Sequence, residues 1–499
     1  MAQGAQIQLT LVGQQGNYLT MDAQNSFFDS KHITYADFAV ESVVTDAQGN
    51  PDFGKTAKFK FNGTSELISG GYIETRISAL QAPSTGSGST FAYAVAWVHM
   101  IGIYMFKSIE FTVNQSKIDI QYPQYLDMMF RLTIGKDRIE AFNDMIGEVN
   151  IIKNVGLQDT IVVDQIDPDC PVIHSKFSAT GLIPDAPGTP GYTKPEMTLY
   201  FPLQFWWCKD YSQALPAGLL LFSGIEINVV YEEYPKLYMC YQRAINVPST
   251  SWVGPYTTTQ NYNYSTMVLP SKPTIIDAKL YLDQVFLEKT ARDRLLSKAL
   301  LYVIKQVKTP GPQSVKNSIE NYRFSAAMPV ASIYFGIQED AAVDAQYKRY
   351  DWWDRFTGNV WTYNQATANS SNFNQLPESP IKDCRLMILS NERFTTRGWM
   401  YWTRYQPWVS AIKVIPRTRG IFQFHFALFP QDTLASGTIN MSQTDNNSLY
   451  INMNNSVIKN GNTLGGIGQN GITGNIYFFT ENHNYIFVEN GYMNLLYTV

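Results

Sequence analysis

The sequence predicts an all-β protein with two large antiparallel domains of the sandwich or jelly-roll type. Short strand patterns bounded by turn residues recur along the whole chain. A strand followed by a short helix, between residues 276 and 298, begins a second copy of the same plan. The length of 499 residues fits two such domains, since β-sandwiches commonly reach about 200 to 250 residues as one unit.

The composition predicts a large buried core and a weakly charged surface. Hydrophobic residues make up 45% of the chain and aromatic residues 14%, whereas only 16% are charged. The net charge of -4 argues against a chain that wraps nucleic acid, because that role needs clustered Lys and Arg to displace counterions. We therefore expect protein partners and no sequence-specific binding of nucleic acid.

The cysteines and the N-terminal sequence indicate a reducing, cytosol-like environment. The four cysteines lie far apart with no CxxC spacing, which favours buried thiols over a zinc cluster or a disulfide framework. The first residues lack the basic and apolar segments of a secretory signal, and no span of about 18 apolar residues predicts a membrane helix. The cysteines are Cys170, Cys208, Cys240 and Cys384.

The first half contains short strands and one clear hairpin. Lys107–Val113 and Lys117–Gln121 flank the polar turn Asn114-Gln115-Ser116. Apolar residues alternate from Ile225 to Tyr231, which predicts a strand with one buried face. The other strands expected here are Lys58–Phe61, Tyr72–Ile77 and the aromatic-rich Leu199–Cys208.

The junction between the halves is predicted from a loss of periodicity. Residues 247–273 contain several prolines and no sustained pattern, so we expect a linker there. After it, Ile276, Ala278, Leu280 and Leu282 alternate with polar residues, which predicts a half-buried strand that opens the second domain. A short surface helix is expected over Glu288–Lys298. The expected division is an arm at 1–25, domains at 26–246 and 274–499, and the linker between them.

The second half is expected to repeat this plan with longer loops. The segment Glu339–Pro380 is too long for a tight connection and is predicted to form an exposed tower on the outer surface, with Trp352, Trp353 and Trp361 covered by neighbouring loops of the assembly. The expected strands are Arg385–Leu389, Trp399–Arg404, Gly420–Leu428, Ser436–Met441, Leu449–Asn452, Ile476–Phe479, Tyr485–Val488 and a last strand at the end of the chain.

No catalytic, cofactor-binding or metal-binding residue is expected. None of the five histidines lies at metal-ligand spacing from another, and no GxSxG motif occurs. In the strand Phe422-Gln423-Phe424-His425-Phe426, alternation places His425 opposite the phenylalanines, as a hydrogen-bonded or solvent-facing side chain. The histidines are His32, His99, His174, His425 and His483.

Two other motifs have stronger structural than chemical interpretations. Residues 466–471 match GxGxxG, but Asn and Gly surround them where a phosphate site needs a strand and a helix, so a loop is expected. Asp351-Trp352-Trp353-Asp354 offers two carboxylates beside an aromatic sugar platform, as in a glycosidase. Acids in a long loop are more often solvated, and the tryptophans more often fix the loop or contact a partner.

Several blocks, taken together and in order, resemble the double jelly-roll major capsid proteins of the nucleocytoplasmic large DNA viruses. The similarity covers almost the whole chain. The blocks that carry it are Tyr35 to Ala39, Glu66-Leu67-Ile68 with Tyr72-Ile73, Lys107 to Ile120, Pro202 to Tyr231, Leu280 to Arg294, Asn391 to Phe394, Ser436 to Ser442 and Asn482 to Tyr485. Departures at Ala435, Asn114-Gln115 and Trp207 affect turns and packing, and they suggest a divergent lineage.

The resemblance implies two consecutive eight-stranded antiparallel jelly rolls with short helices and long surface loops. It implies a capsid role without an enzymatic activity: a homotrimer whose six lobes form a pseudo-hexagonal capsomer in an icosahedral shell. The implied partners are the chain itself, minor capsid and penton proteins and an internal membrane, with the arm at the base. The implied location is the virion, assembled in host cytoplasm. Two alternatives remain: a jelly-roll carbohydrate-binding protein or glycanase, and a scaffolding relative absent from mature particles.

Overall fold

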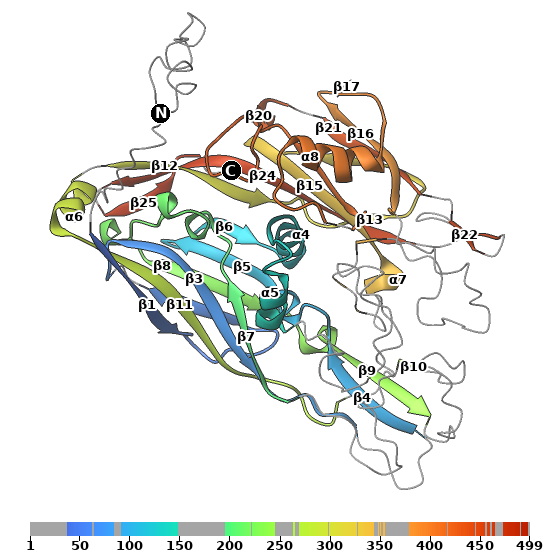
Figure 1. The fold of residues 1–499 in the computed structure, drawn as a ribbon, viewed down its shortest axis with the longest axis horizontal. Helices are drawn as coiled ribbons and strands as arrows, with labels where there is room; N and C mark the ends of the chain where they lie inside the picture. The colour runs from blue at the N-terminus through green and yellow to red at the C-terminus, as the bar shows by residue number, and fades with distance from the viewer. Residues whose placement is uncertain are drawn as a thin grey trace, which may run out of the picture.

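The computed structural model places both halves of the chain in β-sheet sandwiches (Figure 1). The residues it describes are 37–61, 64–83, 91–147, 195–220, 222–244, 263–264, 269–297, 299–326, 328–343, 348, 350, 353–354, 379–416, 418–444, 446–454, 457–459, 462–464, 473–489 and 491–497. The expected arm, the GxGxxG segment and most of the expected linker and tower lie outside these residues.

The first half is a sandwich of two four-stranded antiparallel sheets. One sheet has the order β1-β11-β3-β7 and the other has the order β2-β8-β5-β6. If these eight strands are numbered along the chain, the sheets read 1-8-3-6 and 2-7-4-5. The bounds are β1 Phe38–Asp46, β2 Thr56–Phe61, β3 Leu67–Ile77, β5 Phe106–Val113, β6 Ser116–Gln121, β7 Met197–Pro202, β8 Ile225–Tyr231 and β11 Ile275–Leu287.

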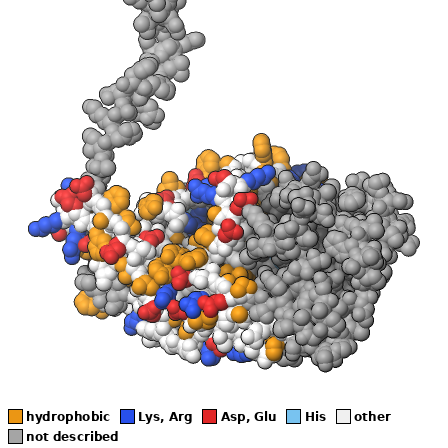
Figure 2. Space-filling model, turned by 60° about the horizontal axis from the view of Figure 1, so that its bottom comes forward, with side chains coloured by type: hydrophobic (Ala, Val, Ile, Leu, Met, Phe, Trp, Pro, Cys, Tyr) orange, Lys and Arg blue, Asp and Glu red, His pale blue; other side chains and the backbone are white. Residues whose placement is uncertain are grey.

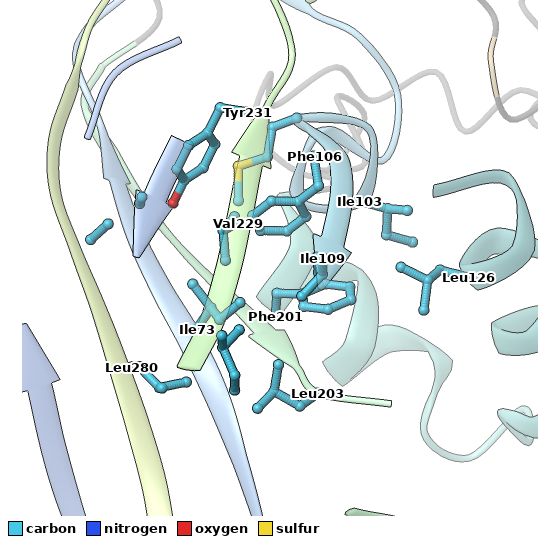
Figure 3. Close-up of a cluster of buried hydrophobic side chains, with 14 of the residues drawn as sticks. Ile73, Ile103, Phe106, Ile109, Leu126, Phe201, Leu203, Val229, Tyr231 and Leu280 are labelled. Carbon is cyan, nitrogen blue, oxygen red and sulfur yellow. The ribbon is translucent and has the colours of Figure 1, made fainter. Parts of the chain in front are cut away.

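The core of this sandwich forms because the inward positions of both sheets are apolar. β8 has an exact alternation of buried and half-buried residues, as the sequence predicts. Ile73 and Leu280 of one sheet face Val229 of the other, and Phe201 packs edge-on against Phe106 at 5.1 Å between ring centroids (Figure 3). Burial of these side chains supplies the main free energy of folding.

The second half has the same strand order. Its sheets are β12-β24-β15-β19 and β14-β21-β16-β17, which again read 1-8-3-6 and 2-7-4-5. The double jelly roll predicted from the sequence is therefore present. The bounds are β12 Leu300–Lys308, β14 Ile319–Phe324, β15 Pro329–Glu339, β16 Ile381–Ile388, β17 Asn391–Glu392, β19 Ile421–His425, β21 Asn447–Met453 and β24 Gly474–Glu489.

Both sandwiches carry additional short strands and helices. The additional strands are β4 Phe91–Trp97, β9 Tyr238–Ala244 and β10 Asn263–Tyr264 in a separate sheet, together with β13 Gln313–Val315, β18 Arg397–Gly398, β20 Ile439–Asn440, β22 Val457–Lys459, β23 Asn462–Leu464 and β25 Tyr492–Leu495. The α-helices are α3 Ile101–Tyr104, α4 Pro123–Thr133, α5 Ile139–Ile146, α6 Lys289–Leu296, α7 Asp340–Val343 and α8 Gln406–Val409. Among the described residues, every helix is too short or too polar to span a bilayer.

The strand after the expected linker is a correction to the sequence interpretation. β11 does not open the second jelly roll, because it pairs with β1 and β3 and is the eighth strand of the first. Ala278, Leu280 and Leu282 are buried as expected, but Ile276 is exposed and Ile275 is buried. A register shift between Ile275 and Asp277 explains the reversal. The linker at 247–273 stays a prediction.

Other predicted elements differ in type or extent. The hairpin at Asn114-Gln115 is confirmed, with both residues at positive φ as a two-residue hairpin turn requires. The predicted strand Trp399–Arg404 is instead a π-helix over Tyr401–Tyr405 that continues into α8. The two strands predicted at 476–479 and 485–488 are one long strand, β24. The strand predicted over Leu199–Cys208 ends at Pro202.

Candidate functional site

The histidines of the described residues form no reactive constellation. His425 is buried, with its Nδ1 3.0 Å from Ser332 Oγ and its Nε2 3.1 Å from Gln423 Oε1. Burial lowers the pKa of His425 to about 4, so the imidazole is neutral at physiological pH. Burial also lowers the pKa of His483. Within the described part of the chain, no group of three or more His, Cys, Asp and Glu side chains could hold a metal ion.

Two of the four residues in the motif Asp351-Trp352-Trp353-Asp354, which the sequence offers as a sugar site, lie inside the protein. Trp353 is 1% exposed and Asp354 is also buried, so neither can serve as a surface platform for a glycan. The carboxylate of Asp354 accepts hydrogen bonds from the Thr418 hydroxyl and the Arg419 amide. Asp351, Trp352 and Trp361 lie outside the described residues. The expectation that neighbouring loops of an assembly cover Trp353 is wrong, because its own chain covers it.

Trp353 belongs to a buried contact between the two jelly rolls, which we call the seam. One side of the seam is α4, which follows β6 of the first jelly roll; the other is the outer face of the β12-β24-β15-β19 sheet (Figure 1). Tyr125 packs on Tyr334 and Phe479, with centroid separations of 6.5 and 5.6 Å. The other buried members are Met128, Met129, Leu132, Val307, Trp353, Ile412 and Ile421.

Trp353 fixes the edge of the seam through one hydrogen bond and one close backbone approach. Its Nε1 donates to Asp127 Oδ2 at 2.7 Å, and the same carboxylate accepts from Tyr104 and Arg131, so this buried charge is fully paired. A Cβ at Gly420 would clash with the Trp353 carbonyl oxygen, which makes glycine necessary there.

A buried carboxylate forms the polar centre of the seam. Glu481 of β24 accepts hydrogen bonds from the hydroxyls of Tyr125, at 2.5 Å, and Tyr334, at 3.4 Å. Burial raises its pKa, but the positive charges of Lys209 and Lys305 and the bond from Tyr125 outweigh burial, so the pKa lies below the usual value. Glu481 is therefore ionised and joins the two jelly rolls.

A second set of hydrogen bonds joins β6 to β12. The Val307 amide donates to Asp119 Oδ1 at 3.1 Å, and the Gln306 side chain donates to the Ile118 carbonyl. Burial raises the pKa of Asp119 to about 6, because the charged form is poorly solvated there. The directional bonds of the seam fix the relative position of the two jelly rolls.

Sequence reasoning missed α4, although the sequence contains a signal for it. Pro123 stands at the first turn, and Leu126, Met129 and Phe130 follow at helical spacing. The buried role of Glu481 had no such signal, since its partners lie far away in the sequence.

The second candidate surface is apolar and exposed. It lies on the π-helix and α8, where Met400, Tyr405, Trp408 and Val409 are largely accessible to solvent. Trp408 is 77% exposed, which is unusual for so large an apolar side chain in a protein with ample core. Several such side chains on one short segment indicate a protein contact rather than a catalytic site.

Comparisons with known proteins agree with this geometry. The family model for the major capsid protein N-terminus matches residues 26–288, and the model for the large eukaryotic DNA virus major capsid protein matches residues 291–494. The major capsid protein of Phaeocystis pouchetii virus is 23% identical, over 92% of this chain and 95% of that protein. The major capsid protein of Paramecium bursaria Chlorella virus 1 is 22% identical, over 90% and 87%.

Solved structures share the fold at low sequence identity. The Faustovirus major capsid protein superposes with a TM-score of 0.66 at 15% identity, covering 96% of this chain and 94% of that one. VP54 of PBCV-1 superposes with a TM-score of 0.65 at 17% identity, covering 95% and 100%. The chain thus has two jelly rolls of one topology, joined by a buried seam, and the two family models together match nearly its full length. It therefore belongs to the major capsid proteins of large eukaryotic DNA viruses.

Proposed function

We propose that three copies of this major capsid protein form a pseudo-hexagonal capsomer that tiles an icosahedral shell. The observation that carries the proposal is the strand-for-strand repeat: both jelly rolls read 1-8-3-6 and 2-7-4-5. Three copies provide six lobes of one topology, so a threefold assembly approximates a hexagon. The seam supports the proposal, because six lobes give a regular outline only if each pair has a fixed geometry.

Related structures provide further support. One solved relative, with a TM-score of 0.65, is described as a quasi-atomic model of the PBCV-1 virus capsid. A weakly charged surface also suits this role, since copies can pack side by side without strong mutual repulsion. The role is structural rather than enzymatic, and the site of action is the virion.

The proposal also includes the other components of the shell and the place of assembly. Minor capsid and penton proteins would contact the edges of the capsomer and the vertices of the shell, and residues 1–25 would face them or an internal membrane. Assembly would take place in host cytoplasm. The proposal includes no cofactor. It also includes no direct sequence-specific contact with nucleic acid, in keeping with the net charge of -4.

The test is the mass and shape of the purified protein. Multi-angle light scattering at micromolar concentration should give three times the mass of one chain, and electron microscopy should show a particle with six lobes. A monodisperse monomer would refute the capsomer.

Two further measurements separate the alternatives. Proteomics of purified particles should detect the chain as an abundant component, whereas a scaffolding relative would be absent. A glycan array and a hydrolysis assay should be negative, because Trp353 and Asp354 are buried.

A further inference from the structure

The two jelly rolls carry corresponding helical segments. In the first, α4 lies between the fifth and sixth strands, β6 and β7. In the second, the π-helix Tyr401–Tyr405 and α8 lie between the fifth and sixth strands, β17 and β19. The same topological position in two equivalent sandwiches makes the surroundings of one segment a guide to those of the other.

Each segment places one side in its own core. Leu126 and Phe130 of α4 are buried in the core of the first jelly roll. Trp402 of the π-helix is buried in the core of the second, in edge-on contact with Phe335 at 5.7 Å between centroids. The inner sides of the two segments therefore have the same role, since each anchors its segment in the core of its own jelly roll.

The outer sides differ in whether they are covered. The outer side of α4 packs on the outer face of the next 1-8-3-6 sheet, β12-β24-β15-β19, through Tyr125, Met128, Met129 and Leu132. The outer side of the second segment has equally large side chains, which include Tyr405, Trp408 and Val409, but they are exposed. The single chain provides a covering sheet for the first segment and leaves the second uncovered.

The first jelly roll has the sheet that corresponds to β12-β24-β15-β19, namely β1-β11-β3-β7, and the outer face of this sheet is exposed. The outer face of β1-β11-β3-β7 has a row of tyrosines: Tyr72 stacks on Tyr281, with centroids 4.8 Å apart, and lies 5.8 Å from Tyr200. Val44 is the register partner of Tyr281 on β1, and both Val44 and Val40 are exposed. Figure 2 views the molecule from the lower side of Figure 1, where β1 and β11 lie, and shows hydrophobic side chains gathered among charged ones.

The charges of the two uncovered surfaces are complementary. The strand register aligns Asp46, Lys279 and Glu74 on the outer face of the sheet. Lys279 already pairs with Asp277 at 3.0 Å, and Arg76, on the same face, pairs with Glu196. Asp283 also lies on this face, so acidic groups are in excess there. The helical segment is flanked instead mainly by exposed cationic side chains, namely Arg393, Arg397 and Lys413. Glu392, an exposed acid beside them, lies 4.0 Å from Arg385.

We propose that the π-helix and α8 of one copy dock on the outer face of the β1-β11-β3-β7 sheet of the next copy, which repeats between copies the contact that α4 makes within one. Trp408 would lie over Val44 and the tyrosine row. The two surfaces lie on opposite sides of the chain in Figure 1, as a head-to-tail contact requires, and such contacts form a closed ring when the rotation per copy permits it. This inference rests on the proposed trimer and names the surfaces that form it.

The experiment compares single variants of the full chain by light scattering at one micromolar concentration. Trp408→Glu adds a negative charge facing the acidic sheet. Val44→Glu places a carboxylate beneath Trp408, where the contact would bury it away from water. Each should convert the trimer to a monomer. Tyr211→Glu is the matched control, because Tyr211 is an exposed aromatic residue on a turn outside both surfaces, and it should remain trimeric. Circular dichroism should show a folded chain for each variant.

The outcomes distinguish this inference from the proposed function. A monomeric parent protein would refute the trimer and this contact together. A trimeric parent with trimeric Trp408→Glu or trimeric Val44→Glu would refute only the contact, and the capsomer would stand. If Trp408→Glu aggregates, Met400→Glu and Val409→Glu test the same exposed surface. Trimers in both of these variants would also overturn the contact.

Discussion

The core of the first jelly roll and the seam between the jelly rolls are both buried, but different forces hold them. The core is almost wholly apolar, so its stability comes from non-directional burial. The seam combines apolar packing around Tyr125 with the buried charges of Asp127 and Glu481. Such charges contribute little net stability but require one geometry, since a displaced partner leaves a buried charge unpaired. The core thus holds each sandwich together, and the seam sets their relative position.

The largest effect is expected from Trp353→Ala, which damages both kinds of contact in the seam. Loss of the ring should lower the free energy of unfolding by about 3 to 5 kcal/mol, measured by urea denaturation at a fixed protein concentration. Trp353→Phe keeps most of the packing and removes only the bond to Asp127, so it should cost less. A loss under about 1 kcal/mol for Trp353→Ala would show that the seam tolerates a cavity.

A core substitution should have a comparable but purely apolar effect. Ile227 of β8 is fully buried, so Ile227→Ala should cost about 2 to 5 kcal/mol of unfolding free energy. Ile276→Ala, on the exposed side of β11, is the control and should change stability by less than about 0.5 kcal/mol. Equal losses in the two variants would contradict the assignment of inner and outer faces.

The seam, unlike the core, should respond to pH. The pKa of Asp119 is raised to about 6, above its unfolded value near 3.8, so the folded state favours the protonated acid. Its stabilising contribution is therefore present below pH 3.8 and is lost as the pH rises through 6. His425, with a pKa lowered to about 4, acts in the opposite direction, because its contribution is lost as the pH falls from 6.5 to 4.

Asp119→Asn isolates the first of these contributions. Relative to the parent protein, the variant should become progressively more stable as the pH is raised from 4 to 7, as measured by urea denaturation at each pH. A stability difference that does not change with pH would show that Asp119 does not titrate in this range.

The smallest effect is expected from His425→Ala. The variant leaves Ser332 and Gln423 without their shared partner, so it should cost about 1 to 3 kcal/mol of unfolding free energy. The mass of the assembly should stay the same, since His425 belongs to neither proposed contact surface. Loss of bound zinc or of a hydrolytic activity in this variant would instead favour an enzyme.

Local pattern alone determined much of the fold. The alternation from Ile225 to Tyr231 predicts the full extent of β8, and the turn at Asn114-Gln115 predicts the hairpin. The helix expected over Glu288–Lys298 is α6. Period-two alternation also predicts the side of β19 on which His425 lies. Phe422 and Phe424 are in the core of the second jelly roll, whereas His425 packs on Tyr334 at the outer face of the sheet. These features depend on neighbours within a few residues, so the sequence contains the information for them.

The tertiary structure decided where each element is used. β11 has the pattern of a half-buried strand, but only its hydrogen bonds to β1 and β3 place it in the first jelly roll. From the sequence alone, Trp353 looks like a surface residue of a long loop. In the structure, Met128, Gly336 and Gly420 form the buried site that holds it. The aromatic residues of Tyr401–Tyr405 suit a strand locally, yet packing of Trp402 in the core selects a π-helix. Contacts with residues outside the local segment determine these outcomes. A local pattern shows whether a side chain is polar or apolar, but not which other surface will cover it.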